Sequence, residues 1–316
     1  MKKPTAAPVS TVYGPVPSRR LGFSLGIDLF PRKTCSFDCV YCQLGKSGRK
    51  TSIRKDYVPA ARVLEDVKRA LAKGQLIDHI TFSGSGEPTL HSGIGAIIKA
   101  IKKVTKVPVA VLTNASLLSL KEVRDSLKTA DVVVPSLDAA LPAVWKKVNH
   151  PLPSLSLEAI VSGLATFKRS FKGQVWLEVM LVKGINDKPE HILALKKAIA
   201  RVRPDKVQLN TVTRPPAEKS AGPLTPAELE SIRRRLGGNT EVVAGFQEKK
   251  QTAGSRRLKE VLFGLIRRRP VTLKDMASAL GESRDAIRAN LDLLLQERRI
   301  VSTMHKGQVF YEACGE

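Results

Sequence analysis

Three cysteines stand close together in a chain that has only four. They are Cys35, Cys39 and Cys42, spaced C-x3-C-x2-C, whereas Cys314 stands apart near the end and is expected to be a free, exposed thiol. Clustered thiols in a reducing cytosol bind metals or act in catalysis more often than they form disulfides. Three thiolates on one short loop match a cubane iron–sulfur cluster that leaves one iron open to a non-protein ligand.

A structural zinc site is the alternative for the same thiols. Such a site is closed by four ligands, and no histidine occurs between residues 1 and 78. A fourth ligand would have to come from a distant part of the chain, and the candidates are His79, His91 and Cys314. The local supply of three thiols therefore favours a cluster, with zinc as the open alternative.

Polar residues follow several predicted strands at the point where each strand ends. Residues 84–87, with Gly84 and Glu87 at their ends, follow one strand; Asn114, Ser136, Asp138 and Asn210 follow later ones. In parallel α/β folds the active site lies at the carboxyl ends of the strands. We therefore expect these side chains to share one site with the cysteine loop.

Strand-like and helix-like patterns alternate along most of the chain. The strands are near-continuous runs of valine, isoleucine and leucine, which is typical of a parallel sheet covered by helices on both faces. Six such units with short, right-handed connections predict an α/β fold, either an open sheet or, as we favour, a partial (βα)6 parallel TIM-like barrel. The expected strands are 23–30, 79–84, 107–114, 131–138, 174–182 and 206–212, and the expected helices are 60–74, 93–104, 118–129, 156–171 and 188–202.

A separate pattern occupies the last part of the chain. A helix at 255–268, a T-x-x-D capped helix at 272–280 and a helix capped by Ser283 precede two strands around a His-Lys-Gly turn. A helix, a helix–turn–helix and a hairpin together describe a winged helix. The expected organisation is a core domain at 1–246, a linker at 247–254 and a winged helix-turn-helix domain at 255–316.

The chain is strongly basic, with 53 lysines and arginines against 29 acidic residues and a net charge of +24. From Gln247 onward, 14 basic and nine acidic residues leave +5, so the first 246 residues carry +19. This excess suggests a polyanionic partner such as nucleic acid, and a charge that serves solubility is an equally open interpretation. No apolar stretch suits a signal peptide or a membrane span, so the cytoplasm is the expected location.

The motifs together resemble the radical S-adenosylmethionine (SAM) superfamily over roughly residues 12 to 214. The cysteine spacing with Tyr41 before the last cysteine, and "FSGSGEPTL" one strand later, are similar to that family's cluster loop and Gly-Gly-Glu-type segment. The resemblance implies a [4Fe–4S] cluster on Cys35, Cys39 and Cys42, with SAM on the open iron. It further implies reductive cleavage of SAM to a 5′-deoxyadenosyl radical, which abstracts hydrogen from a substrate.

The resemblance also implies which residues bind SAM. Gly84, Gly86 and Glu87 stand where the family holds the methionine ammonium, and glycine lets the backbone approach it closely. Tyr41 is expected to shield the cluster and to contact adenine through its backbone.

Other implied SAM contacts come from later strands. Ser136, Asp138 and Glu178 match positions that often meet the ribose or the carboxylate of SAM, and Asn210 and Thr211 match an adenine site. For Ser136 and Asn210 a simple role in capping the strand ends is the alternative.

Residues 13–45 most closely resemble uncharacterised iron–sulfur oxidoreductases related to the enzyme that builds the tricyclic wyosine base of tRNA. Arg19 and Arg20 could clamp a substrate phosphate or carboxylate, or could pair with acids such as Asp28 or Asp38. No motif singles out the Schiff-base lysine that the tricyclising relatives need. A tRNA substrate therefore does not follow from the resemblance alone.

In a winged helix that binds DNA, Arg284 and Arg288 would enter the major groove and Lys306 on the wing would meet a phosphate. Asp285 and Asp292 share that exposed side, so docking onto RNA, a protein or a neighbouring domain is also open. The leading interpretation is a radical SAM enzyme of unidentified substrate, with RNA or tRNA as a candidate and flavodoxin or ferredoxin as electron donor. The alternative is an iron–sulfur redox-sensing regulator that binds nucleic acid.

Overall fold

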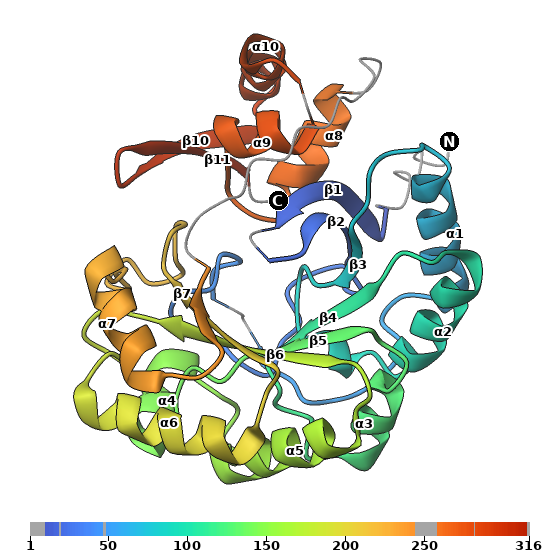
Figure 1. Cartoon of the computed structure of the whole chain (residues 1–316). Helices are drawn as coiled ribbons and strands as arrows, with labels where there is room; N and C mark the ends of the chain where they lie inside the picture. Colours follow the sequence, from blue (N-terminus) through green and yellow to red (C-terminus); the bar gives the residue numbers. More distant parts are fainter. Residues whose placement is uncertain (1–9, 19, 47–48, 244–257, 281, 315–316) are drawn as a thin grey trace.

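The computed structural model describes residues 10–18, 20–46, 49–243, 258–280 and 282–314 (Figure 1). Arg19 and the predicted linker at 247–254 lie outside these described residues. No helix in the described ranges combines the length and the apolar character that a bilayer span requires.

An eight-stranded sheet forms the larger part of the molecule, and its strands follow one another in chain order from β1 to β8. β1 pairs antiparallel with β2, and every later neighbour is parallel. Figure 1 shows the sheet curving inside a ring of helices, as the predicted partial barrel requires. The strands are β1 (Val12–Ser18), β2 (Gly22–Ile27), β3 (His79–Phe82), β4 (Val109–Thr113), β5 (Val132–Pro135), β6 (Gln174–Leu181), β7 (Lys206–Thr211) and β8 (Thr240–Val242).

The six predicted strands are confirmed as β2 to β7, whereas β1 and β8 were not predicted. β1 contains Pro15 and Pro17, which donate no backbone hydrogen bond and therefore suit a sheet edge. Its pairing with β2 also shifts register between Tyr13 and Val16, so it lacks a regular alternating pattern. β8 is only three residues long and forms the other edge.

Helices cover the outer face of the sheet, and their apolar sides form the core with the strands. In α1, for example, Val63 and Val67 are one turn apart and fully buried. Ser156 caps α5 as predicted, because its side chain accepts a hydrogen bond from Ala159 N. The helices are α1 (Ala60–Leu71), the 3-10 turn η1 (Pro88–Leu90), α2 (Ile94–Val104), α3 (Lys121–Leu127), α4 (Pro142–Asn149), α5 (Leu157–Ser170), α6 (Pro189–Val202) and α7 (Pro226–Leu236).

The C-terminal module, which we define as the described residues from 258 to 314, contains the predicted elements in the predicted order. Asp275 N donates to Thr272 Oγ1 at 3.1 Å and Ala286 N donates to Ser283 Oγ at 3.2 Å, so both predicted helix caps are present. β9, β10 and β11 form an antiparallel sheet in the order β10-β11-β9. The assignment as a winged helix stays a prediction. The elements are α8 (Leu258–Ile266), β9 (Val271–Thr272), α9 (Leu273–Leu280), α10 (Arg284–Gln296), β10 (Ile300–His305) and β11 (Gln308–Ala313).

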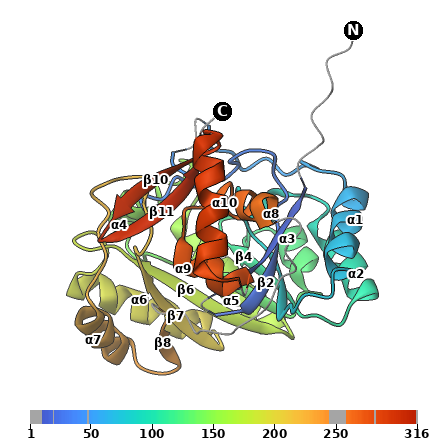
Figure 2. The same cartoon turned by 90° about the horizontal axis from the view of Figure 1, so that it is seen from above.

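The C-terminal module packs against β1, at the edge of the sheet (Figures 1 and 2). Val16 of β1 is buried in the module's own apolar core, and Tyr13 lies against it. Arg268 of the module forms an ion pair with Asp28, whose side chain is completely buried. Arg268 also donates to Ser10 O at 2.7 Å. The module is therefore docked by apolar contacts and by a buried ion pair.

Candidate active site

The cysteine loop follows β2 and is fastened to the loop after β3 by a short parallel bridge between Thr34 and Gly86. Thr34 N donates to Ser85 O at 2.8 Å, and Glu87 N donates to Thr34 O at 3.0 Å. A Cβ atom on Gly86 would overlap the Thr34 carbonyl oxygen, so the bridge itself requires glycine. The contact joins the two motifs that the sequence placed one strand apart.

Gly84 is also required by packing within the chain. Its φ of +126° lies in a region that side-chain-bearing residues rarely adopt, and a Cβ would stand 2.6 Å from Asp28 Cγ. Asp28 in turn accepts hydrogen bonds from Ser85 N at 3.0 Å and Ser85 Oγ at 2.6 Å. The glycines thus allow this loop to lie tightly against β2 and the cysteine loop.

Glu87 is buried and ties the end of β3 to the end of β4. Its Oε1 accepts hydrogen bonds from Thr89 N at 3.0 Å, Thr89 Oγ1 at 2.6 Å and Thr113 Oγ1 at 2.6 Å, and its Oε2 accepts one from Asn114 N at 2.6 Å. Burial raises the pKa of Glu87, although these four donors oppose the shift. The carboxylate therefore holds the loop geometry next to the cysteines.

The three clustered thiols are free and partly buried, and they lie within eight residues of the sequence. Burial raises the pKa of Cys35 to about 12, and the charges of Glu87 and Cys42 add to that shift. Burial also raises the pKa of Cys39 well above its usual range, with further contributions from Asp138, Cys35 and Cys42. A bound metal would offset this cost, because metals stabilise the thiolate form.

Two asparagine amides donate to cysteine sulfurs. Asn114 Nδ2 lies 3.4 Å from Cys35 Sγ, and Asn149 Nδ2 lies 3.2 Å from Cys39 Sγ. Asn114 follows β4, as the sequence indicated, whereas Asn149 ends α4, a helix that was not predicted. Hydrogen bonds to sulfur tune the reduction potential of iron–sulfur clusters, so both amides belong to the chemistry of the loop.

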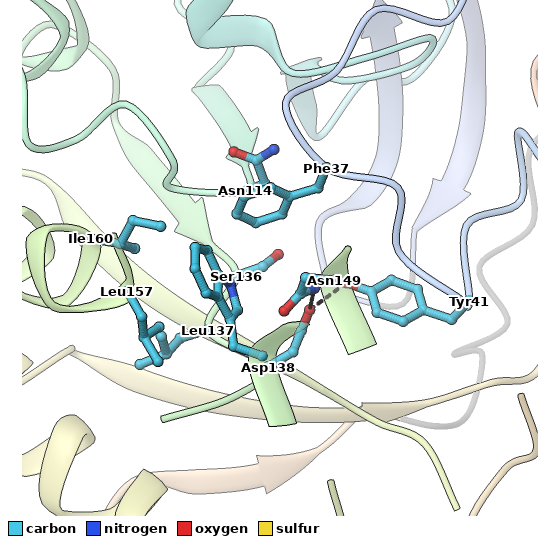
Figure 3. A pocket seen from close by; sticks show the side chains of 10 residues that line it. Phe37, Tyr41, Asn114, Ser136, Leu137, Asp138, Asn149, Leu157 and Ile160 are labelled. Atoms are coloured by element: carbon cyan, nitrogen blue, oxygen red, sulfur yellow. Dashed lines mark hydrogen bonds between the residues drawn. The ribbon is translucent and has the colours of Figure 1, made fainter. Parts of the chain in front are cut away.

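A small pocket beside the cysteine loop brings Tyr41 and Asp138 into direct contact (Figure 3). Asp138 also accepts hydrogen bonds from Asn149 Nδ2 at 2.6 Å and Met180 N at 2.9 Å. Burial raises the pKa of Asp138 to about 6. The pocket volume of about 10 Å³ has room for roughly one water. The lining residues are Phe37, Tyr41, Asn114, Ser136, Leu137, Asp138, Trp145, Asn149, Leu157 and Ile160.

A larger cavity of about 230 Å³ lies inside the barrel and contains the other predicted site residues. Glu178 and Asn210 meet there, with Asn210 Nδ2 donating to Glu178 Oε1 at 3.1 Å. Arg20 forms an ion pair with Glu178. Arg214 and Arg269 line the same cavity and were not predicted, because nothing distinguishes them among 53 basic residues.

Arg20 was expected either to clamp a substrate anion or to pair with an acid such as Asp28 or Asp38. It does pair with an acid, but that acid is Glu178. Asp28 pairs with Arg268, and Asp38 pairs with Lys33 at 2.7 Å. The fifth predicted strand supplies the partner of Arg20, Glu178, through the folding of the barrel.

The zinc alternative needs a fourth protein ligand, and in the described part of the chain no group of three or more His, Cys, Asp or Glu side chains, the three thiols included, is placed to hold a metal ion. Two candidate fourth ligands have other partners: His79 Nδ1 lies 2.8 Å from Leu21 O, and the buried His91 Nε2 lies 2.9 Å from Val58 O. Cys314 is free but partly buried, not exposed as expected.

Comparisons with known proteins agree with the iron–sulfur interpretation of the cysteine loop. A sequence profile described as "Radical SAM superfamily" matches residues 30–195. The chain is 30% identical over 315 residues to a UPF0026 protein of Methanocaldococcus jannaschii, covering 96% of each protein. It is 36% identical over 303 residues to a protein of Brachyspira hyodysenteriae named GTPase Obg, which covers 95% of this chain and only 45% of that protein.

More distant similarity reaches a protein of Protochlamydia amoebophila named probable dual-specificity RNA methyltransferase RlmN 2, 24% identical over 50% of this chain and 45% of that protein. Among solved structures, Streptococcus suis SuiB bound to S-adenosylmethionine has a TM-score of 0.52 and 15% identity, covering 68% of this chain and 49% of that one. A radical SAM methyltransferase of Sphaerobacter thermophilus also has a TM-score of 0.52 and 15% identity, covering 69% and 66%. At this identity the structures are informative about the fold alone.

Proposed function

The chain belongs to the radical SAM superfamily and to its UPF0026 proteins, and we propose that it is an enzyme that cleaves SAM reductively to begin a radical reaction on RNA. The observation that best supports this proposal is the group of three free thiols on one loop. A backbone bridge joins that loop to the Gly84–Glu87 loop at the carboxyl edge of a parallel sheet. When bound, a [4Fe–4S] cluster supplies the electron that converts SAM to methionine and a 5′-deoxyadenosyl radical. The family match favours this enzyme over an iron–sulfur regulator.

The chain's own residues have defined tasks in this proposal. Cys35, Cys39 and Cys42 would hold the cluster, while Asn114 and Asn149 donate hydrogen bonds to two of the sulfurs. The residues that we assign to SAM binding, Tyr41 through its backbone, are Tyr41, Gly84, Gly86, Glu87, Ser136, Asp138, Glu178 and Asn210.

An RNA substrate is supported by charge and by similarity. The first 246 residues carry +19, and Arg32, Arg49 and Lys55 are exposed close to the cysteine loop in the sequence. Backbone pairing of Thr51 N with Cys35 O at 2.9 Å keeps this basic segment beside the cysteines. The RNA methyltransferase named above is a distant relative. A kinship with the wyosine-synthesis enzyme is a further part of the proposal.

The remaining assignments complete the proposal. We place the reaction in the cytoplasm, with flavodoxin or ferredoxin as the electron donor. The core domain is assigned to 1–246, the linker to 247–254 and a winged helix to 255–316. Because the winged helix is docked onto β1, we assign it a contact with the core domain in preference to DNA binding.

The proposal is tested by anaerobic reconstitution with iron and sulfide, followed by addition of dithionite and SAM. We expect visible cluster absorbance and formation of 5′-deoxyadenosine by the wild-type protein. Single Cys35→Ala, Cys39→Ala and Cys42→Ala variants should lose both signals, whereas Cys314→Ala should keep them. Absence of cluster absorbance and of SAM cleavage in the wild type would overturn the proposal.

A further inference from the structure

The larger cavity is lined by residues of the barrel and of the C-terminal module. Strands β1 to β4, β6 and β7 contribute to its lining, and Arg269 of the C-terminal module completes it. Arg269 stands in the α8–β9 connection, next to Arg268, which forms the buried ion pair with Asp28. Figure 1 shows this module lying beside β1 and β2. The cavity is therefore complete only when the module is docked.

Positive charge exceeds negative charge in this cavity. Three arginines line it: Arg20, Arg214 and Arg269. Glu178 pairs with Arg20, and Asp275 lies 3.9 Å from Arg214. Within the described residues, Arg269 forms no ion pair and donates no hydrogen bond. One guanidinium charge is thus left without a carboxylate.

The surroundings of Arg269 disfavour its charge. Burial lowers the pKa of Arg269 and the charge of Arg20 adds to this effect, while Tyr13 and Asp275 partly offset it. A partly buried cation of this kind is stabilised when an anion enters and accepts its hydrogen bonds. Hydroxyl groups also line the cavity. Tyr13 Oη and Ser83 Oγ hydrogen-bond each other at 2.8 Å, and Ser24 Oγ donates to Thr81 Oγ1 at 2.5 Å. One proton of each pair, and that of Ser18, can therefore be donated to the anion.

We propose that the cavity binds a phosphate group of the substrate through Arg269, Arg20 and Arg214. The proposal rests on the proposed function, because it assigns the bound group to the RNA substrate of that reaction. The three guanidinium groups come from three separate segments, which suits an anion with several oxygens pointing in different directions. A carboxylate has two oxygens in one plane, which a single guanidinium can bind bidentately.

The proposal is tested by titrating the full chain with inorganic phosphate at low salt. Isothermal titration calorimetry measures the affinity. We expect saturable binding by the wild type and affinity weakened about tenfold or more in Arg269→Gln, since a hydrogen-bonded charge is lost. The matched control is Arg288→Gln, which removes an exposed charge from α10 of the same module and should leave the affinity unchanged. Thermal unfolding of both variants shows whether each remains folded.

A second variant changes the affinity in the opposite direction, which misfolding cannot do. Glu178→Gln removes the carboxylate that competes for Arg20, so phosphate should bind more tightly. Equal phosphate affinity in wild type and Arg269→Gln, or binding of malonate in place of phosphate, would overturn the inference. Because this assay needs neither cluster nor SAM, its failure is distinct from failure of SAM cleavage, which is measured separately.

Discussion

At the scale of single residues, the buried Glu87 carboxylate accepts its described hydrogen bonds from other groups of the protein. Four donors from three residues converge on its two oxygens, and it is 2% exposed. We predict that Glu87→Gln lowers the free energy of unfolding by about 1–3 kcal/mol, because the amide NH2 would face donors where an oxygen accepted. Urea unfolding followed by tryptophan fluorescence measures the change.

The matched control for this prediction is Glu65→Gln on α1, where the side chain is exposed. Its effect should stay within about 0.5 kcal/mol, as is usual for surface substitutions. Equal stability of Glu87→Gln and wild type would show that the hydrogen bonds to Glu87 do not hold the loop.

Asn149 sets a second prediction at this scale, through its hydrogen bond to Cys39 Sγ. A donor to sulfur stabilises the more negative, reduced form of a cluster, so Asn149→Ala should make the reduction potential more negative. One hydrogen bond corresponds to roughly 20–60 mV for a one-electron couple. A redox titration monitored by electron paramagnetic resonance measures the shift in the reconstituted protein.

Asn290→Ala is the control for Asn149→Ala, because Asn290 donates to Ala286 O within α10 and not to a cysteine. Its potential should equal that of the wild type. A shift toward more positive potential in Asn149→Ala would contradict the assigned role of the amide.

Residue-level prediction succeeded where local spacing carries the chemistry and failed where folding brings distant residues together. The three thiols lie within eight residues, so their common loop was visible in the sequence. Asn149 reaches Cys39 across 110 residues, and Arg20 reaches Glu178 across 158. No local pattern marks such pairs, and only the folded barrel reveals them.

At the scale of elements, regular and buried segments were the predictable ones. β2 to β7 are apolar runs because helices cover the parallel sheet, and that burial leaves a clear signature. β1 has prolines and a register shift, and α4 has only eight residues. These two elements still matter for the site, since β1 carries the C-terminal module and α4 ends at Asn149.

The ion pair of Arg268 with Asp28 helps to dock the C-terminal module, together with the apolar contacts of Val16 and Tyr13. Arg268→Ala would leave a buried carboxylate without its cation, so we predict a loss of about 3–5 kcal/mol in unfolding free energy. Urea unfolding measured with two signals checks this loss. Trp145 and Trp176 both lie in the barrel, so tryptophan fluorescence reports the unfolding of the barrel, whereas far-ultraviolet circular dichroism reports the unfolding of the barrel and of the module.

Removing both charges tests whether the ion pair is the cause. The double variant Asp28→Asn with Arg268→Ala should recover part of the lost stability, because no unpaired charge remains buried. Additive losses from the two single substitutions would contradict the coupling. Arg288→Ala serves as the control, since its side chain is exposed on α10 of the same module.

At the scale of the whole molecule, basic side chains are exposed at two edges of the parallel sheet: the edge formed by the carboxyl ends of the strands and the edge formed by their amino ends. Arg32, Arg49 and Lys55 are exposed near the cysteine loop, which follows the carboxyl end of β2. A shallow lysine-rich surface lies at the other edge, where β4, β5 and β6 begin. A substrate that reacts at the cluster must reach the first edge, so the two surfaces should differ in their contribution to RNA binding.

We predict that RNA binding weakens steeply with salt and that the basic residues near the cysteine loop set part of the slope. For single strands the slope of log K against log salt falls by about 0.7 for each phosphate contact. The combined change of Arg32, Arg49 and Lys55 to glutamine should therefore flatten the slope by about 2, as measured by fluorescence anisotropy with a labelled RNA at several salt concentrations. The charge-matched control changes three exposed lysines at the other edge: Lys99, Lys103 and Lys172. An equal loss of slope in both triple variants would mean that RNA binds through overall charge and not at the edge where the thiols lie.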